Sequence, residues 1–188
     1  MDIEMAIVVG GLVALVGVFI AYYNRFVRLE QARMQAEGDV AAQLSQRWDL
    51  APQMAGLVAR YMTHEADLLQ NLTKARHEAS PFAPSEGGPF GPQGDGPLRG
   101  AMAQFFARAE AYPQLRADTT FAHMQTALEE AEAQIAAARR AFNAATASYN
   151  AAIRQFPANV VAGVLGFRSC AYTEAKTEAV SRPTPFQV

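Results

Sequence analysis

The chain has 188 residues and a mass of 20.3 kDa, which allows one domain with an appendage. Sixteen Lys and Arg against eighteen Asp and Glu give a net charge of −2, which argues against a nucleic-acid partner and against acidic disorder. One Cys and three His cannot form a disulfide framework and disfavour a dedicated zinc site. We therefore expect stability to come from packing, and we expect no metal and no cofactor.

Residues 5–23 form an apolar run of 19 residues without charge or proline. At about 1.5 Å per residue, a helix of this length crosses a hydrocarbon core of roughly 30 Å, and Tyr22 and Tyr23 suit the headgroup layer. A cleaved signal peptide is the alternative, but the preceding flank is acidic and no small-x-small cleavage site follows the run. The run predicts a single retained transmembrane helix in a lipid bilayer, behind a stub of residues 1–4.

The charges on either side of the run predict its orientation. Asp2 and Glu4 precede the run, whereas Arg25, Arg28 and Arg33 follow it closely. Positively charged flanks are retained in the cytoplasm. We expect the N-terminus outside and the bulk of the chain in the cytoplasm; a periplasmic protein on an uncleaved anchor is the alternative and has the opposite topology.

Small residues recur along the apolar run: Ala6, Gly10 and Ala14 are spaced by four, and Gly17 and Ala21 continue that spacing one helix face over. Such a pattern lets helix backbones approach closely in lipid, although Gly and Ala are common in membrane helices in any case. Self-association through this face is therefore one of two open interpretations. The residues are Ala6, Gly10, Ala14, Gly17 and Ala21.

The strongest periodic signal lies between residues 121 and 156. Large apolar residues fall every seven positions there, and smaller residues fill the seam between them, which is a heptad a/d pattern. It predicts a helix of about 38 residues, with Asp118 or Thr119 as its N-cap, that packs closely on a neighbour. The large residues are Phe121, Leu128, Ile135, Phe142, Tyr149 and Phe156, and the smaller ones are Met124, Ala131, Ala138, Ala145 and Ala152.

A second apolar seam runs through residues 51–75 at spacings of three and four, and only Glu65 interrupts it. A carboxylate on a seam is either a ligand or register-setting group, or a residue at the edge of the seam with its head in water. The second situation is the more frequent one and is our expectation.

The same helical stripe extends back toward the membrane through Val40, Leu44 and Trp48. The anchor is therefore expected to run into the first long helix with little break. Pro52 lacks a backbone donor, so it predicts a bend or irregularity at residues 48–52.

Residues 80–97 are rich in Pro and Gly and predict a flexible linker. A further helix is expected to begin near Leu98 and to stop at Tyr112, because Pro113 disfavours the helical conformation of the residue before it. Together these patterns predict an all-α protein: a transmembrane helix followed by an elongated antiparallel bundle of about four helices with coiled-coil-like seams. The bundle is placed at residues 24–180, and residues 181–188 are expected to form a flexible tail.

Residues for catalysis are few. His64 and Glu65 begin a string that resembles the zinc motif HExxH, but Leu68 stands where the second ligand belongs. The alternative class is an enzyme or a metal or cofactor binder that uses His64, Glu65 and His123 inside the bundle. We expect instead that the protein is not an enzyme.

Residues 156–167 carry no charge and follow the long predicted helix directly. They predict either a cap packed over one end of the bundle or a contact patch that enters a partner protein or the membrane interface. The apolar residues of this candidate patch are Phe156, Val160, Val161, Val164, Leu165 and Phe167.

Six groups of residues in sequence order resemble the LemA family of bacterial membrane-anchored proteins. The resemblance covers most of the chain after the anchor, although Glu37, Gln53 and the Pro/Gly-rich linker depart from the family pattern. The matching residues are Tyr23, Asn24 and Leu29; Asp49, Leu50 and Pro52; Tyr61, His64 and Glu65; Ala109 to Pro113 with Leu115; Ala138 to Arg140 with Phe142, Asn143, Tyr149 and Asn150; and Phe156, Pro157, Asn159, Val161 to Gly163, Gly166 and Phe167.

The resemblance implies a bundle of about four helices behind one anchor in the bacterial cytoplasmic (inner) membrane. It implies no established catalytic activity, and it suggests a link to membrane-organelle formation, with which relatives in magnetosome-forming bacteria are associated. The sequence as a whole predicts a non-enzymatic, membrane-anchored scaffold or interaction protein that forms homo-oligomers.

Overall fold

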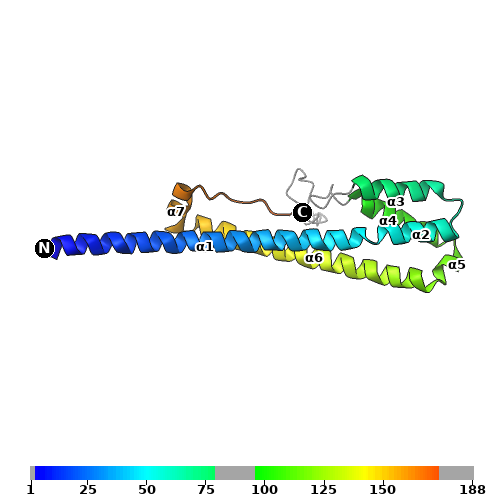
Figure 1. Cartoon of the computed structure of the whole chain (residues 1–188), viewed down its shortest axis with the longest axis horizontal. Helices are drawn as coiled ribbons and strands as arrows, with labels where there is room; N and C mark the ends of the chain where they lie inside the picture. Colours follow the sequence, from blue (N-terminus) through cyan, green and yellow to red (C-terminus); the bar gives the residue numbers. More distant parts are fainter. Residues whose placement is uncertain (1–2, 79–95, 174–188) are drawn as a thin grey trace, which may run out of the picture.

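The computed structural model describes residues 3–78 and 96–173, and within these ranges the chain is all-α, as predicted (Figure 1). Most of the expected linker and the whole expected tail lie outside the described residues, while Gly96 and Pro97 already belong to a helix. The helices are α1 (Ile3–Trp48), α2 (Ala51–Tyr61), α3 (Ala66–Glu78), α4 (Gly96–Ala109), α5 (Pro113–Arg116), α6 (Thr119–Arg154) and α7 (Ala158–Leu165).

The candidate membrane span and the first helix of the bundle are one continuous helix. α1 has 46 residues, which corresponds to about 70 Å at 1.5 Å per residue. No side chain is buried in its most apolar stretch, and its first buried side chain is Phe26. The predicted irregularity is confirmed: α1 ends at Trp48, and α2 begins at Ala51 with Pro52 in its first turn, where a missing N–H costs no helical hydrogen bond.

α1 and α6 pack along each other in antiparallel directions and form a two-helix stem (Figure 1). Near the start of the stem Phe26 packs with Tyr149, and farther along Val40 and Leu44 pack with Phe142. The predicted heptad seam is thus the buried side of α6. Its later residues face α1, whereas Phe121 and Met124 at its start join an apolar cluster with residues of α2 to α5. The N-cap of α6 is Asp118, whose carboxylate accepts the backbone N–H of Thr120 at 2.7 Å.

The predicted heptad seam is wrong at its last position. Phe156 lies beyond the end of α6, and 84% of its surface is exposed. The reason is that α6 ends at Arg154 and the next residue, Gln155, has an extended backbone, so the seventh residue after Tyr149 no longer lies on the same helix face.

A compact head at the far end of the stem is built from α2 to α5 and the first half of α6 (Figure 1). The single seam predicted over residues 51–75 is wrong, because α2 ends at Tyr61 and α3 begins at Ala66. No Gly or Pro marks this turn, so the apolar spacing continues across it. Both halves of the seam nevertheless face one core, to which they contribute Met54, Val58, Leu68 and Leu72.

The stability of the protein is expected to depend strongly on Phe142, which is fully buried between α1 and α6. Phe142→Ala is expected to lower the free energy of unfolding by about 3–5 kcal/mol, because it removes buried apolar surface and leaves a cavity. Unfolding of the full-length protein in detergent, followed by circular dichroism, measures this loss. The matched control is Phe156→Ala, which removes an exposed ring; equal losses in the two variants would contradict the packing of the stem.

Candidate functional site

α7 lies at the end of the stem from which the candidate membrane span projects (Figure 1). Its small residues Ala158 and Ala162 are buried against Phe26, Tyr149 and the last turn of α6. Small side chains allow this close approach of α7 to the stem. Half of the predicted contact patch therefore acts as a cap over the end of the bundle.

The other half of the patch faces outward. Phe156, Val160 and Val164 expose 84%, 60% and 75% of their surface, whereas Val161 and Leu165 are half-buried. Large apolar side chains clustered on a surface commonly mark an interaction site. The short helix α7 thus has one face packed on the stem and one exposed apolar face.

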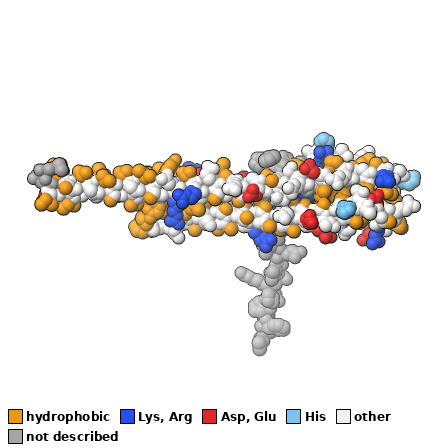
Figure 2. All heavy atoms as spheres, turned by 60° about the horizontal axis from the view of Figure 1, so that its bottom comes forward, with side chains coloured by type: hydrophobic (Ala, Val, Ile, Leu, Met, Phe, Trp, Pro, Cys, Tyr) orange, Lys and Arg blue, Asp and Glu red, His pale blue; other side chains and the backbone are white. Residues whose placement is uncertain are grey.

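Aromatic rings tie the end of α7 to the end of the candidate membrane span. The ring of Phe167 lies 6.2 Å from that of Tyr23 and 5.2 Å from that of Phe26, and Tyr22 lies 6.1 Å from Phe26. Gly166 precedes Phe167 with φ of +79°, a left-handed conformation that glycine adopts without strain. In Figure 2 a bulge of hydrophobic side chains stands beside the span at this level, next to Lys or Arg side chains.

The extended segment after α7 is held on α6 by two asparagine side chains whose role the sequence did not reveal. The amide of Asn150 donates to the carbonyl of Cys170 and accepts its N–H, both at 2.9 Å. Asn143 pairs in the same way with the carbonyl and N–H of Thr173, at 3.1 and 2.9 Å. Each side-chain amide thus makes the two hydrogen bonds that the backbone of a neighbouring β-strand would otherwise make.

The distance between the two asparagines on α6 matches the distance between the two backbone positions that they bind. Seven helical residues between Asn143 and Asn150 rise about 10.5 Å, and three extended residues between Cys170 and Thr173 span about 10 Å. The only sequence signal was the repeat of an aromatic residue followed by Asn at heptad spacing. Phe142 and Tyr149 face α1, and the Asn after each faces the extended segment.

An ion-pair cluster joins the turns of the head. Arg108 on α4 donates to Glu65 and, at 2.9 Å, to Asp67 at the start of α3, while the Tyr112 hydroxyl donates to Glu65 at 3.2 Å. These bonds lower the pKa of the Asp67 carboxyl and raise the pKa of Arg108. The expectation that Glu65 points into water is therefore wrong, because it links the α2–α3 turn to α4.

A second group of polar contacts joins the end of α2 to the start of α6. The Tyr61 hydroxyl donates to Asp118 at 2.5 Å, and the Arg60 guanidinium lies 3.7 Å from the same carboxylate. The hydrogen bond from Tyr61, together with the backbone N–H of Thr120, lowers the pKa of Asp118. Three residues that carry the family resemblance, Tyr61, Glu65 and Tyr112, thus connect the helices of the head.

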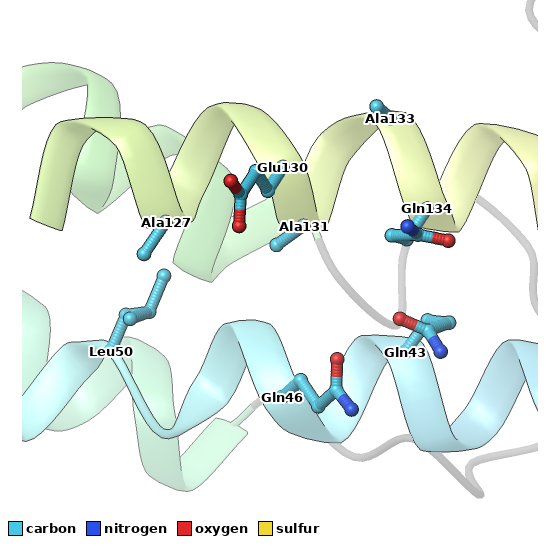
Figure 3. A pocket seen from close by; sticks show the side chains of 8 residues that line it. All are labelled: Gln43, Gln46, Leu50, Ala127, Glu130, Ala131, Ala133 and Gln134. Carbon is cyan, nitrogen blue, oxygen red and sulfur yellow. The ribbon is translucent and has the colours of Figure 1, made fainter. Parts of the chain in front are cut away.

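A groove of about 720 Å³ lies between α1 and α6 near the head (Figure 3). Its wall combines amide, small and apolar side chains, with Gln43 of α1 reaching toward Gln134 of α6. Beside it the buried Arg47 donates to Glu132 at 2.6 Å, and burial lowers the pKa of Arg47. The eight residues that line the groove include one ionisable side chain, Glu130, and so offer no pair of groups for acid–base chemistry.

The residues of the alternative enzyme hypothesis do not meet inside the bundle. His64 lies exposed in the α2–α3 turn, His123 is exposed on α6, and Glu65 is engaged by Arg108. Among the residues described, no three His, Cys, Asp or Glu side chains form a group that could hold a metal ion. The structure therefore does not show the interior placement that the alternative hypothesis requires for these three residues.

The small residues of the span lie on an open helix surface. Ala6, Gly10, Ala14, Gly17 and Ala21 are all exposed. A Cβ atom added at Gly10 or Gly17 would meet nothing within 4 Å. This face is sterically free to receive another helix.

The asparagine pairs generate a prediction for Cys170, the one cysteine of the chain. Asn150→Asp replaces the amide donor by a carboxylate that repels the Cys170 carbonyl, so the extended segment is expected to detach more often. Maleimide labelling of Cys170 should then be about tenfold faster, as expected for the loss of roughly 1.4 kcal/mol. Ser148→Ala is the control, since the hydrogen bond described for that hydroxyl ends on the Ala144 carbonyl of its own helix; equal labelling rates in both variants would refute the role of Asn150.

Comparison with known proteins agrees with the resemblance in the sequence. The family model described as "LemA family" matches residues 36–186. Magnetosome protein MamQ of Magnetospirillum gryphiswaldense is 26% identical over 93% of this chain and 73% of its own length. Magnetosome protein MamQ 2 of Paramagnetospirillum magneticum is also 26% identical, over 92% of this chain and 72% of its own length. The family match covers four fifths of the chain, and the protein therefore belongs to the LemA family.

Proposed function

We propose that this protein is a non-enzymatic, membrane-anchored scaffold of the bacterial inner membrane. Its N-terminus would lie outside and its stem and head in the cytoplasm. The observation that carries the proposal is the continuity of α1, which joins an apolar stretch without buried side chains to the buried seam of the stem without a hinge. A scaffold of this kind acts by association alone.

The continuity of α1 would give the head a defined height above the membrane. From Tyr23 to Trp48 the helix rises about 38 Å. The seam with α6 stiffens this stretch. The Arg47–Glu132 ion pair favours one register of α1 along α6. The protein would thus hold its head, with the ion pairs around Glu65 and Asp118, at a constant distance from the bilayer.

The relatives support a role in membrane organisation. Both bear the name magnetosome protein, and their alignments reach at least part of the candidate span because they cover more than nine tenths of this chain. We extend to this chain the general role of a protein that organises a membrane, without a specific organelle or partner.

Self-association is the second part of the proposal. The face with Gly10 and Gly17 is unoccupied in the single chain, and close backbone approach is a main source of helix association in lipid. Homo-oligomers formed through the span would array the heads at one height.

The topology is tested with two reporters at Val188. Alkaline phosphatase, which is active only outside the cytoplasm, is expected to be inactive there, and green fluorescent protein is expected to fluoresce, because the arginines after the span are retained inside. Expression of each fusion is checked by immunoblot. Active phosphatase with a dark fluorescent fusion would refute the proposed topology.

The association face is tested with Gly10→Leu, which places a large side chain where a second backbone would approach. Self-association, measured by energy transfer between labelled full-length chains in vesicles, is expected to weaken about tenfold. Val8→Leu, on the opposite side of the helix, is the control and is expected to keep the wild-type value. Wild-type chains that show no energy transfer at any protein-to-lipid ratio would refute self-association.

A further inference from the structure

We propose that the outward face of α7 lies in the headgroup layer of the bilayer that holds α1, as a second membrane contact that favours anionic lipid. This inference rests on the proposed insertion of α1. It assigns lipid, and not another protein, as the partner of the outward face, which consists of Val160 and Val164 of α7 together with Phe156 just before the helix.

The first support is the level of α7 along α1. Phe167, which follows α7 directly, contacts Tyr23 and Phe26, and Tyr23 is the last residue of the apolar run. With residues 5–23 in the hydrocarbon core, this contact places α7 where tyrosine side chains meet the headgroups. The exposed surface of the span and the outward face of α7 then form one continuous apolar surface (Figure 2).

The second support is the division of α7 into two faces. Ala158 and Ala162 pack on the stem, and the larger Val160 and Val164 point the opposite way. Figure 1 shows α7 running across the direction of α1, so a bilayer crossed by α1 would meet the side of α7 and not its end. A helix in the membrane plane with one apolar face outward is the geometry of an interfacial helix.

The third support is the charge around α7. Besides the half-buried Glu30, the charged residues near the end of the span and on both sides of α7 are arginines, namely Arg25, Arg28, Arg154 and Arg168. All four are exposed, and the sequence has no Asp or Glu between Glu132 and Glu174. Apolar side chains with arginines beside them match the boundary between acyl chains and anionic headgroups.

The small size of the outward face favours lipid over a protein partner. Three large side chains are far fewer than the 20–30 residues that each side of a stable protein interface contributes. Lipid requires no such area, because the span already holds α7 at the bilayer surface. The Asn143 and Asn150 pairs keep the face in place by fixing the segment that follows it.

The test measures the depth of single positions in the full-length protein. In a Cys170→Ser background, an environment-sensitive fluorophore is attached to Val160→Cys on the outward face and to Asn159→Cys on the flank of α7. Val13→Cys in the span and Glu129→Cys on α6 are the membrane and water references. The proteins are reconstituted at low density in vesicles of phosphatidylcholine and phosphatidylglycerol that carry quencher-labelled lipids.

The Val160→Cys label is expected to be quenched by lipids labelled near the headgroup, more strongly than the Asn159→Cys label. Val13→Cys should be quenched by lipids labelled deep in the chain, and Glu129→Cys by neither. Omitting phosphatidylglycerol is expected to reduce quenching at Val160→Cys but not at Val13→Cys; equal quenching in both vesicles would overturn the preference for anionic lipid.

Two results separate the inference from the proposed function. If the label at Val13→Cys lies in lipid and the label at Val160→Cys lies in water, the proposed second membrane contact is overturned. The proposed insertion of α1 is then still supported. If Val13→Cys reports water, the proposed anchor fails and the inference fails with it. If the fluorophore at Val160→Cys is shielded from water only at high protein density, a second copy of the chain covers the outward face. That result also overturns the inference.

Discussion

The packing of α1 on α6 is the constraint on which the other parts of the structure depend. Phe142 and Tyr149 of α6 close against α1, and because α1 extends past the end of α6, this seam determines where the helix pair ends and the exposed apolar stretch begins. α7 then occupies the end of the pair, beside Phe26. A shift of the seam by one heptad would move α7 by about 10 Å along α1.

The two ends of the stem use different chemistry. The head is joined by ion pairs and hydrogen bonds, in which Glu65 and Asp118 accept from Arg108, Tyr112 and Tyr61. The end near the span is joined by aromatic rings and small residues, with arginines around it and no carboxylate on α7. Such a polarity difference along a rod suits a protein that meets a bilayer at one end and water at the other.

The residues that carry the family resemblance acquire physical roles at both ends. Tyr61, Glu65 and Tyr112 connect the turns of the head, although their sequence separation hides the connection. Asn143 and Asn150 each follow an aromatic residue of the seam and bind the backbone of the segment after α7. These motif residues act through partners distant in the sequence, so their physical roles appear only in the folded protein.

The sequence by itself determined the features that depend on neighbouring residues: the apolar run, the apolar heptad positions of α6, a start of α6 at Asp118 or Thr119, and the interruption near Pro52. Only the tertiary structure decided the turn after Tyr61, the exposure of Phe156 and the partners of Glu65 and Asn150. The reason is that hydrophobic periodicity reports which face of a segment is apolar, whereas the end of a segment and the partner of a polar group depend on residues brought near by folding.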